Sequence, residues 1–201
     1  MLLLTSNGLS SESMMKKIKP FFTGLSKAVI VTTASIEFKE KDRHIPRLKA
    51  ELHSLGLAVD YFDFDFDDPS KLLQYDVVEI IGGNPFYLLK SMKMSNCEMI
   101  LAELSKSKIL IGVSAGSLVL QNNIELIAQY SPELNREINL SDLAGFHLTD
   151  IEILPHYSRF LSCFERFEER AREHEAREKH KIVRLNDGQG ILIDEEGSII
   201  F

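Results

Sequence analysis

Short apolar runs alternate with amphipathic segments along the first 120 residues of the chain. Runs rich in β-branched and aliphatic residues are typical of buried strands, and an apolar face that repeats every 3.6 residues is typical of a helix. The predicted strands are residues 2–5, 27–33, 57–62, 77–81 and 109–111, and the predicted helices are residues 14–22, 38–55 and 85–104, the last as one helix or two. Because strands that alternate with helices form a mostly parallel sheet covered on both faces, the sequence predicts an α/β fold.

The remainder of the chain is patterned less regularly. Four further strands are predicted over residues 148–154, 181–185, 190–193 and 198–201, the last two as a closing hairpin. A single helix is expected over residues 159–180, with its many glutamates and arginines on a solvated face. Residues 121–139 carry no pattern that predicts an element. At 201 residues the chain is long enough for one well-buried core, and we expect a single domain over residues 1–201.

Charge and cysteine content exclude several classes of function. The net charge of −7 argues against a nucleic-acid-binding protein, whose footprint is a basic face. Only Cys97 and Cys163 are present, in contexts that suggest neither a disulfide framework nor a metal site, which indicates a reducing compartment. Residues 1–4 are too short for a secretory signal, and no apolar run approaches the length of a membrane span. We therefore expect a cytoplasmic protein without membrane contacts.

An acidic row at residues 63–68 alternates with aromatic side chains. This spacing lacks the glycine of a calcium-binding loop, and it favours a solvated strand face with a helix cap over a metal site. We therefore expect no metal at these residues.

The stretch Gly112-Val113-Ser114-Ala115-Gly116 follows a buried strand and precedes residues that favour a helix. In a G-x-S-x-G pattern the small neighbours allow a tight strand-to-helix turn that exposes the serine hydroxyl. The first N–H groups of the following helix would favour an oxyanion at the same place. Ser114 is thus a candidate nucleophile, although glycines also occur in ordinary strand-to-helix turns.

A serine nucleophile needs a base, most often a histidine. Four of the six histidines lie in charged helical segments and are expected at the surface: His44, His53, His174 and His180. His147 has apolar neighbours and is expected to pack. His156 follows Pro155 at the end of a predicted strand, so it is the candidate base, with a strand-end structural histidine as the alternative.

Two acids downstream are candidates for the residue that orients the histidine. Asp187 and Glu195 both follow predicted strands, and the turn around Asp187 is also consistent with an ordinary Asx turn. In α/β-hydrolases the acid lies between the nucleophile and the histidine. Here the best histidine precedes both acids, and this order disfavours an ordinary lipase or esterase.

Three motifs together resemble the dipeptidase E and cyanophycinase family of serine peptidases: IGGNPFYLL at residues 81–89, GVSAG at residues 112–116 and LPHY at residues 154–157. The resemblance implies a three-layer α/β sandwich with a mostly parallel central sheet, of the flavodoxin-like, class I glutamine amidotransferase-like type. It also implies hydrolysis of small peptides, including dipeptides with an N-terminal aspartate, without a cofactor.

The resemblance assigns roles by position. Ser114 would be the nucleophile, His156 the base and Asp187 the acid. Backbone N–H groups of Gly83 and Ala115 would form the oxyanion hole. The positions implied for substrate binding are Asn84 and Arg166, and a surface ion pair is the alternative interpretation of Arg166.

The sequence departs from the family pattern at two places. Asp187 stands where the family has a glutamate, and Pro85 changes the glycine loop. These departures leave open a binding or regulatory module without activity, and an esterase of other specificity is a third alternative. The oligomeric state is open as well, with a homodimer among the alternatives.

Overall fold

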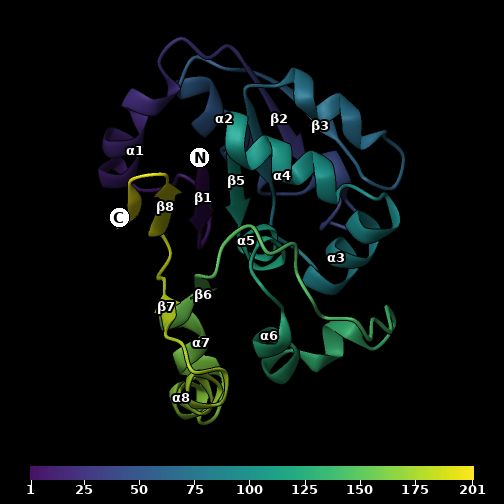
Figure 1. Ribbon diagram of the computed structural model, residues 1–201, viewed down its shortest axis with the longest axis vertical. Helices are drawn as coiled ribbons and strands as arrows, with labels where there is room; N and C mark the ends of the chain where they lie inside the picture. The colour runs from purple at the N-terminus through teal and green to yellow at the C-terminus, as the bar shows by residue number, and fades with distance from the viewer.

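A seven-stranded sheet forms the centre of the protein. The computed structural model describes residues 1–201, and the strands lie in the order β3-β2-β4-β5-β1-β8-β9 (Figure 1). They are β1 Leu2–Thr5, β2 Lys27–Val31, β3 Ala58–Phe62, β4 Val77–Ile80, β5 Ile109–Val113, β8 Gly190–Asp194 and β9 Gly197–Ile200. The first five in this order are parallel, and β8 pairs antiparallel with β1 and β9. The mostly parallel sheet expected from the sequence is confirmed.

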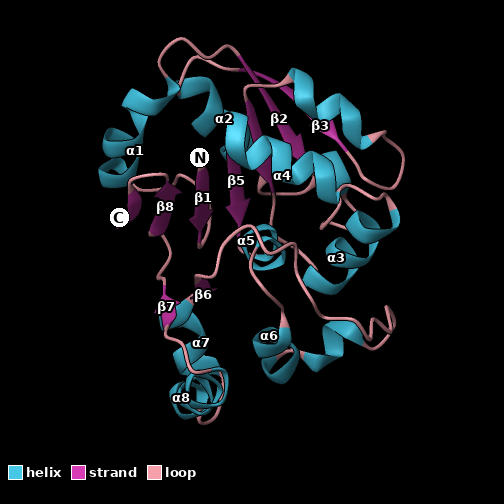
Figure 2. Ribbon diagram, viewed as in Figure 1, coloured by secondary structure: helices cyan, strands magenta, loops and turns pink.

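Helices flank this sheet (Figure 2). Every residue of β4 and β5 is buried, which requires packing on both sides of these central strands. The flanking helices are α1 Glu12–Ile18, α2 Ile45–Ser54, α3 Pro85–Met94, α4 Glu98–Ser107 and α5 Ala115–Leu120. Buried hydrophobic side chains form a cluster of 49 residues. No helix combines the length and the apolar character that a membrane crossing requires.

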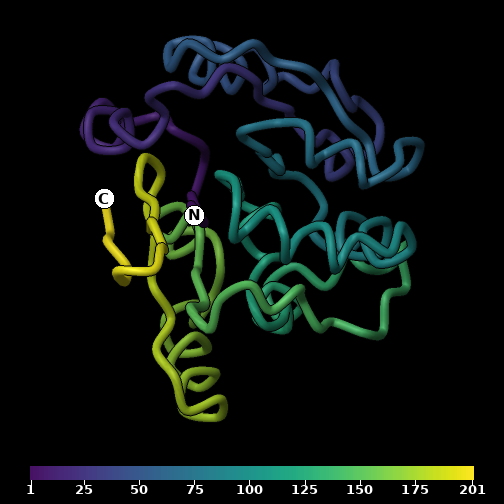
Figure 3. The backbone as a smooth tube through the Cα atoms, turned by 45° about the horizontal axis from the view of Figure 1, so that its top comes forward, coloured from purple at the N-terminus to yellow at the C-terminus, as the bar shows by residue number.

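A second, two-stranded parallel sheet pairs β6 Glu152–Leu154 with β7 Ile182–Arg184. The chain between these strands forms α7 Tyr157–Cys163 and α8 Phe167–Glu178, which extend away from the central sheet (Figure 3). Short 3-10 helices lie at Lys19–Phe22, Lys39–Lys41, Pro69–Gln74 and Pro132–Asn135. The segment without a predicted element contains α6 Glu125–Tyr130.

Two predicted helices are shorter in the structure. The α-helix expected over residues 14–22 ends at Ile18, and a 3-10 turn that contains Pro20 follows. The helix expected over residues 38–55 begins only at Ile45, because Asp42 accepts a hydrogen bond from the backbone N–H of His44 and holds a turn there. In both cases a local contact or a proline stops the helical hydrogen-bond ladder.

The single helix expected over residues 159–180 is wrong, because the chain turns between α7 and α8. Arg166 adopts a left-handed conformation with φ 52°, which an uninterrupted helix does not contain. Phe164 and Phe167, on either side of this turn, both pack against the ring of Tyr130. The strand expected over residues 148–154 is also shorter and begins at Glu152.

Candidate active site

Ser114 lies in a strained turn between β5 and α5. Its backbone has φ 50° and ψ −110°, a conformation that residues with side chains rarely adopt. Strand and helix approach each other closely here: a Cβ on Gly112 would meet the backbone of Ser117, and a Cβ on Gly116 would lie 2.0 Å from the carbonyl oxygen of Ile80. The turn expected from the G-x-S-x-G pattern is thus present, and it places Ser114 at the carboxyl end of β5.

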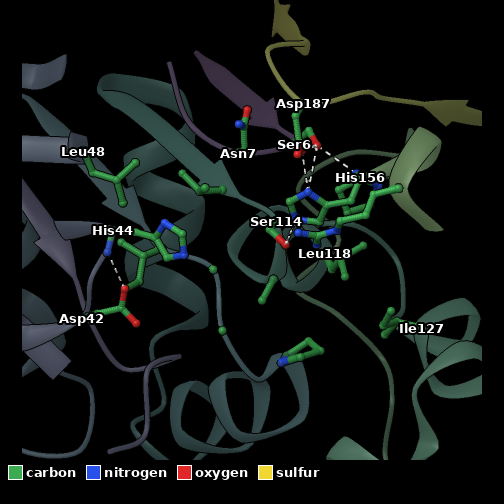
Figure 4. A pocket seen from close by; sticks show the side chains of 18 of the residues that line it. Ser6, Asn7, Asp42, His44, Leu48, Ser114, Leu118, Ile127, His156 and Asp187 are labelled. Carbon is green, nitrogen blue, oxygen red and sulfur yellow. Dashed lines mark hydrogen bonds and ion pairs between the residues drawn. The ribbon is translucent and has the colours of Figure 1, made fainter. Parts of the chain in front are cut away.

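His156 and Asp187 reach Ser114 from the ends of the small sheet (Figure 4). Nε2 of His156 lies 2.9 Å from Oγ of Ser114, and Nδ1 of His156 lies 2.5 Å from Oδ1 of Asp187. His156 follows Pro155, the first residue after β6, so this strand positions it. Asp187 lies three residues after the end of β7, the strand that pairs with β6. Glu195, the other candidate acid, lies instead in the turn between β8 and β9. The arrangement can pass a proton from an alcohol to an imidazole that a carboxylate orients.

Ser6 is a fourth member of this hydrogen-bond network. Its hydroxyl donates to Oδ1 of Asp187 at 2.8 Å and accepts from the backbone N–H of His156 at 2.9 Å. Ser6 is fully buried and follows β1, which lies beside β5 in the sheet. No motif points to this residue, but its place directly after a predicted strand is the signal that could have identified it, because the parallel strands end at the same edge.

Burial and hydrogen bonding shift the pKa values of both titratable groups. Burial is the largest influence on His156 and lowers its pKa below the usual value, and Asp187 opposes this shift only in part. Partial burial would raise the pKa of Asp187, but hydrogen bonds from Ser6 and His156 outweigh it and the net pKa is lowered. At pH 7 the imidazole is therefore mainly neutral and the carboxyl ionised, the states that a general base and its orienting acid need.

Gly83 and Ala115 lie in the wall of the cavity beside Ser114. Gly83 has φ 148°, and a Cβ there would lie 2.2 Å from the carbonyl oxygen of Ala34, so only glycine fits. The N–H of Gly83 makes no hydrogen bond within the protein. Ala115 is the first residue of α5, where N–H groups have no acceptor within the helix. These two donors are suited to bind an oxyanion.

The structure does not bring the two expected substrate-binding side chains to the cavity. Oδ1 of Asn84 accepts hydrogen bonds from N–H groups of the first turn of α3, so this side chain caps the helix. Arg166 is exposed and forms ion pairs with Glu169 at 2.6 Å and Glu173 at 3.1 Å. The surface ion pair, the alternative interpretation of Arg166, is what the structure contains.

Other arginines occupy the cavity instead. Arg43 and Arg159 both line the space of about 520 Å³ next to Ser114. Arg43 donates to Nε2 of His44 and Arg159 lies over the ring of Phe160, so neither guanidinium is held by a carboxylate. Arg47 lies there too, but its guanidinium is bonded to Glu51 and to the carbonyl of Asn7. Two guanidinium groups without a carboxylate partner favour ligands with carboxylates, in spite of the net charge of the chain. The sequence gives no signal for them, because exposed arginines are common.

Comparison with known proteins identifies the family of this chain. A family model described as peptidase family S51 matches residues 2–201. The chain belongs to peptidase family S51. The resemblance to dipeptidase E is thereby confirmed, and the protein is a hydrolase of the peptidase class.

Several known proteins are similar to this chain. An uncharacterized peptidase of Listeria monocytogenes is 31% identical over 158 residues, which cover 73% of this chain and 76% of the relative. One from Listeria innocua is 29% identical, with 73% and 74% coverage. The crystal structure of a Listeria monocytogenes protein classed as peptidase E matches with TM-score 0.71 and 27% identity, over 100% of this chain and 96% of that chain. A peptidase of an acI-B1 actinobacterium matches with TM-score 0.65 and 16% identity, over 94% and 81%, which supports the fold.

Proposed function

We propose that this peptidase is a serine-type enzyme in which Ser114 is the nucleophile, His156 the general base and Asp187 the orienting acid. The observation that carries the proposal is the continuous chain of hydrogen bonds from Oγ of Ser114 through the imidazole to the carboxylate. Neither the missing methylene at position 187 nor Pro85 in the glycine loop interrupts this chain. An inactive binding module would have no need of it.

The proposed reaction uses only groups of this chain. Oγ of Ser114 attacks the scissile carbonyl carbon and its proton moves to Nε2 of His156. The negative oxygen that forms is bound by the N–H groups of Gly83 and Ala115. His156 then gives the proton to the departing amine, and an acyl ester remains on Ser114. Water, deprotonated by His156, releases the acid and restores the serine.

The two arginines of the cavity that have no carboxylate partner indicate the class of substrate. A dipeptide with an N-terminal aspartate carries two carboxylates, one on its side chain and one at its C-terminus, and Arg43 and Arg159 supply two guanidinium groups in the same cavity. We therefore propose small acidic peptides, including dipeptides with an N-terminal aspartate, as substrates, and a cytoplasmic location in which such peptides arise.

A matched dipeptide panel tests the substrate. For the wild-type protein, kcat/KM is expected to be higher for Asp-Leu than for Asn-Leu, which has the same shape without the side-chain charge. Arg159→Gln should reduce this preference about tenfold, the cost of about one charge-assisted hydrogen bond, with little change for Asn-Leu. Hydrolysis is followed by release of free leucine, and Arg172→Gln, an exposed arginine on α8 outside the cavity, is the control.

Ester turnover and labelling of Ser114, measured beside the dipeptide panel, separate a peptidase from an esterase and from an inactive binding module. Turnover of an aryl ester without cleavage of any dipeptide would support the esterase, and no turnover together with no labelling of Ser114 by a fluorophosphonate would support the binding module. Equal rates for Asp-Leu and Asn-Leu would exclude the acidic preference but leave the serine mechanism standing.

Ser6 is expected to hold the imidazole of His156 in its orientation. Ser6→Ala removes the donor to Asp187 and the acceptor of the His156 N–H, so the imidazole loses two constraints on its orientation. We expect kcat to fall about tenfold with little change in KM, because a misdirected base weakens the transition state more than the bound substrate. Steady-state kinetics measure the split between the two constants.

The control for this variant is Ser10→Ala, which removes an exposed hydroxyl from the same loop. Urea unfolding of both proteins shows whether Ser6→Ala acts only through stability. A kcat equal to that of the wild type, or a rise in KM alone, would contradict the positioning role.

A further inference from the structure

Two histidines expected at the surface meet a buried glutamate at the far end of the small sheet. His174, on α8, is buried, and its Nε2 lies 3.1 Å from Oε2 of Glu152 on β6. His180, between α8 and β7, is one-third exposed, and its Nε2 lies 2.5 Å from the same oxygen. The ligand atoms of the three residues all lie within 4.8 Å of one another. None of them lines the cavity beside Ser114.

The carboxylate of Glu152 is incompletely satisfied. Its side chain is only 6% exposed, and its second oxygen, Oε1, is buried without a hydrogen-bond partner. A buried charged oxygen without a partner costs free energy, and such groups in native proteins commonly have a partner such as an ion. The other oxygen already faces two imidazoles, so a cation between the three side chains would use a carboxylate that the protein's own donors leave half unpaired.

We propose that Glu152, His174 and His180 form a binding site for a divalent transition metal, with Zn²⁺ as the best match. One carboxylate and two imidazoles are a set that suits this ion, with ligand atoms at about 2.0–2.2 Å from the metal. Tetrahedral ligands at that distance lie roughly 3.3 Å apart. The distances from Oε2 of Glu152 to the two imidazole nitrogens, 3.1 and 2.5 Å, differ from this value by less than an ångström. The exposed side of His180 leaves room for water as the fourth ligand.

The neighbouring Arg177 determines when this site is open. Its Nη2 donates to Nδ1 of His174 at 2.9 Å, which leaves the proton of a neutral ring on Nε2, the atom that would bind the metal. Metal binding therefore requires the proton to move to Nδ1 and the arginine to turn away. Arg177 is about half exposed and already bonded to Glu178, so it has another partner when it leaves His174. Arg177 and the metal thus compete for one histidine.

The location suggests what the metal does. Glu152 begins β6, which ends two residues before His156. His180 lies two residues before β7, which ends three residues before Asp187. A metal at this site would tie together the two strands that hold the imidazole and the carboxylate near Ser114. It would act on the arrangement of the small sheet and take no part in bond cleavage.

Equilibrium dialysis of the tag-free full chain with Zn²⁺, followed by metal analysis, tests the site. All proteins carry Cys163→Ser, because this exposed thiol could bind zinc by itself. One Zn²⁺ per chain is expected, and His180→Ala and Glu152→Gln should each weaken binding at least tenfold. His147→Ala, which removes an exposed histidine elsewhere, should bind as the wild type does.

Arg177→Ala distinguishes this site from incidental binding. Removal of the competing hydrogen bond should strengthen Zn²⁺ binding about fivefold, the equivalent of one hydrogen bond, whereas an unrelated surface site would not respond. Circular dichroism confirms that each variant is folded. The proposal is overturned if the wild type retains no zinc, if His180→Ala binds as tightly as the wild type, or if Arg177→Ala binds no more tightly than the wild type.

Discussion

Ser114→Ala and His156→Ala are each expected to lower kcat for peptide hydrolysis by about 10⁴- to 10⁶-fold. The Ser114 hydroxyl is unreactive unless the imidazole ring of His156 takes its proton, and the ring has nothing to activate once the hydroxyl is removed. The two side chains are joined by the 2.9 Å contact between Nε2 and Oγ, so they act as one unit. The double variant should therefore lose no more activity than either single variant.

Release of leucine from dipeptides, measured over long incubations, quantifies the residual rates. His53→Ala is the matched control, because this histidine is exposed on α2 and bonds only to the carbonyl of Leu57. Losses that multiply in the double variant would mean that the two residues act independently. A Ser114→Ala protein with wild-type activity would place the nucleophile elsewhere.

Glu79→Gln is expected to make the protein more stable at pH 7 by about 3 kcal/mol. Glu79 lies in β4 at the centre of the sheet, fully buried, and both carboxyl oxygens lack hydrogen-bond partners. Burial, with a smaller contribution from Glu51, raises the pKa of Glu79 from 4.5 to about 8. The group is consequently a neutral acid in the folded protein at pH 7.

The pH dependence of this gain in stability follows from proton linkage. In the unfolded chain Glu79 ionises above pH 4.5, whereas in the folded protein it keeps its proton to about pH 8. Because the folded state binds the extra proton, rising pH favours unfolding over this interval. Glutamine has the same shape and no proton to lose, so the variant avoids this part of the pH dependence. The advantage of Glu79→Gln should thus be small near pH 4.5 and grow toward pH 8.

Urea unfolding of both proteins at several pH values measures this difference. Glu103→Gln, on the exposed face of α4, should leave the free energy of unfolding nearly unchanged at every pH. A difference between wild type and Glu79→Gln that does not vary with pH would show that Glu79 titrates normally.

The parts of the site that the sequence predicts are those carried by local patterns. A short stretch of sequence is enough to recognise the strand before Ser114 and the small residues around it. The same holds for the strand ends before His156 and Asp187. Parallel strands then bring these ends to one edge of the sheet, so the meeting of the three side chains follows from topology.

The parts that the sequence does not predict depend on neighbours far along the chain. His174 lies in a charged helix, and only the position of β6, which places Glu152 against it, buries the ring. His147, expected to pack, is exposed and bonds to the side chain of Asn122. The break at Arg166 depends on the aromatic ring of Tyr130, more than thirty residues earlier. Periodicity along a single segment carries no information on such partners.

The division of the proposed reactive groups between two sheets has a mechanical consequence. Ser114 follows β5 of the central sheet, whereas His156 and Asp187 follow β6 and β7 of the small two-stranded sheet. Side chains of β6 and β7 belong to the same buried cluster as those of the central sheet, and Ser6, which follows β1, bonds both Asp187 and His156. The distance between Oγ of Ser114 and Nε2 of His156 is therefore fixed by the packing between the two sheets, so a substitution in that packing, far from the cavity, is expected to lower kcat.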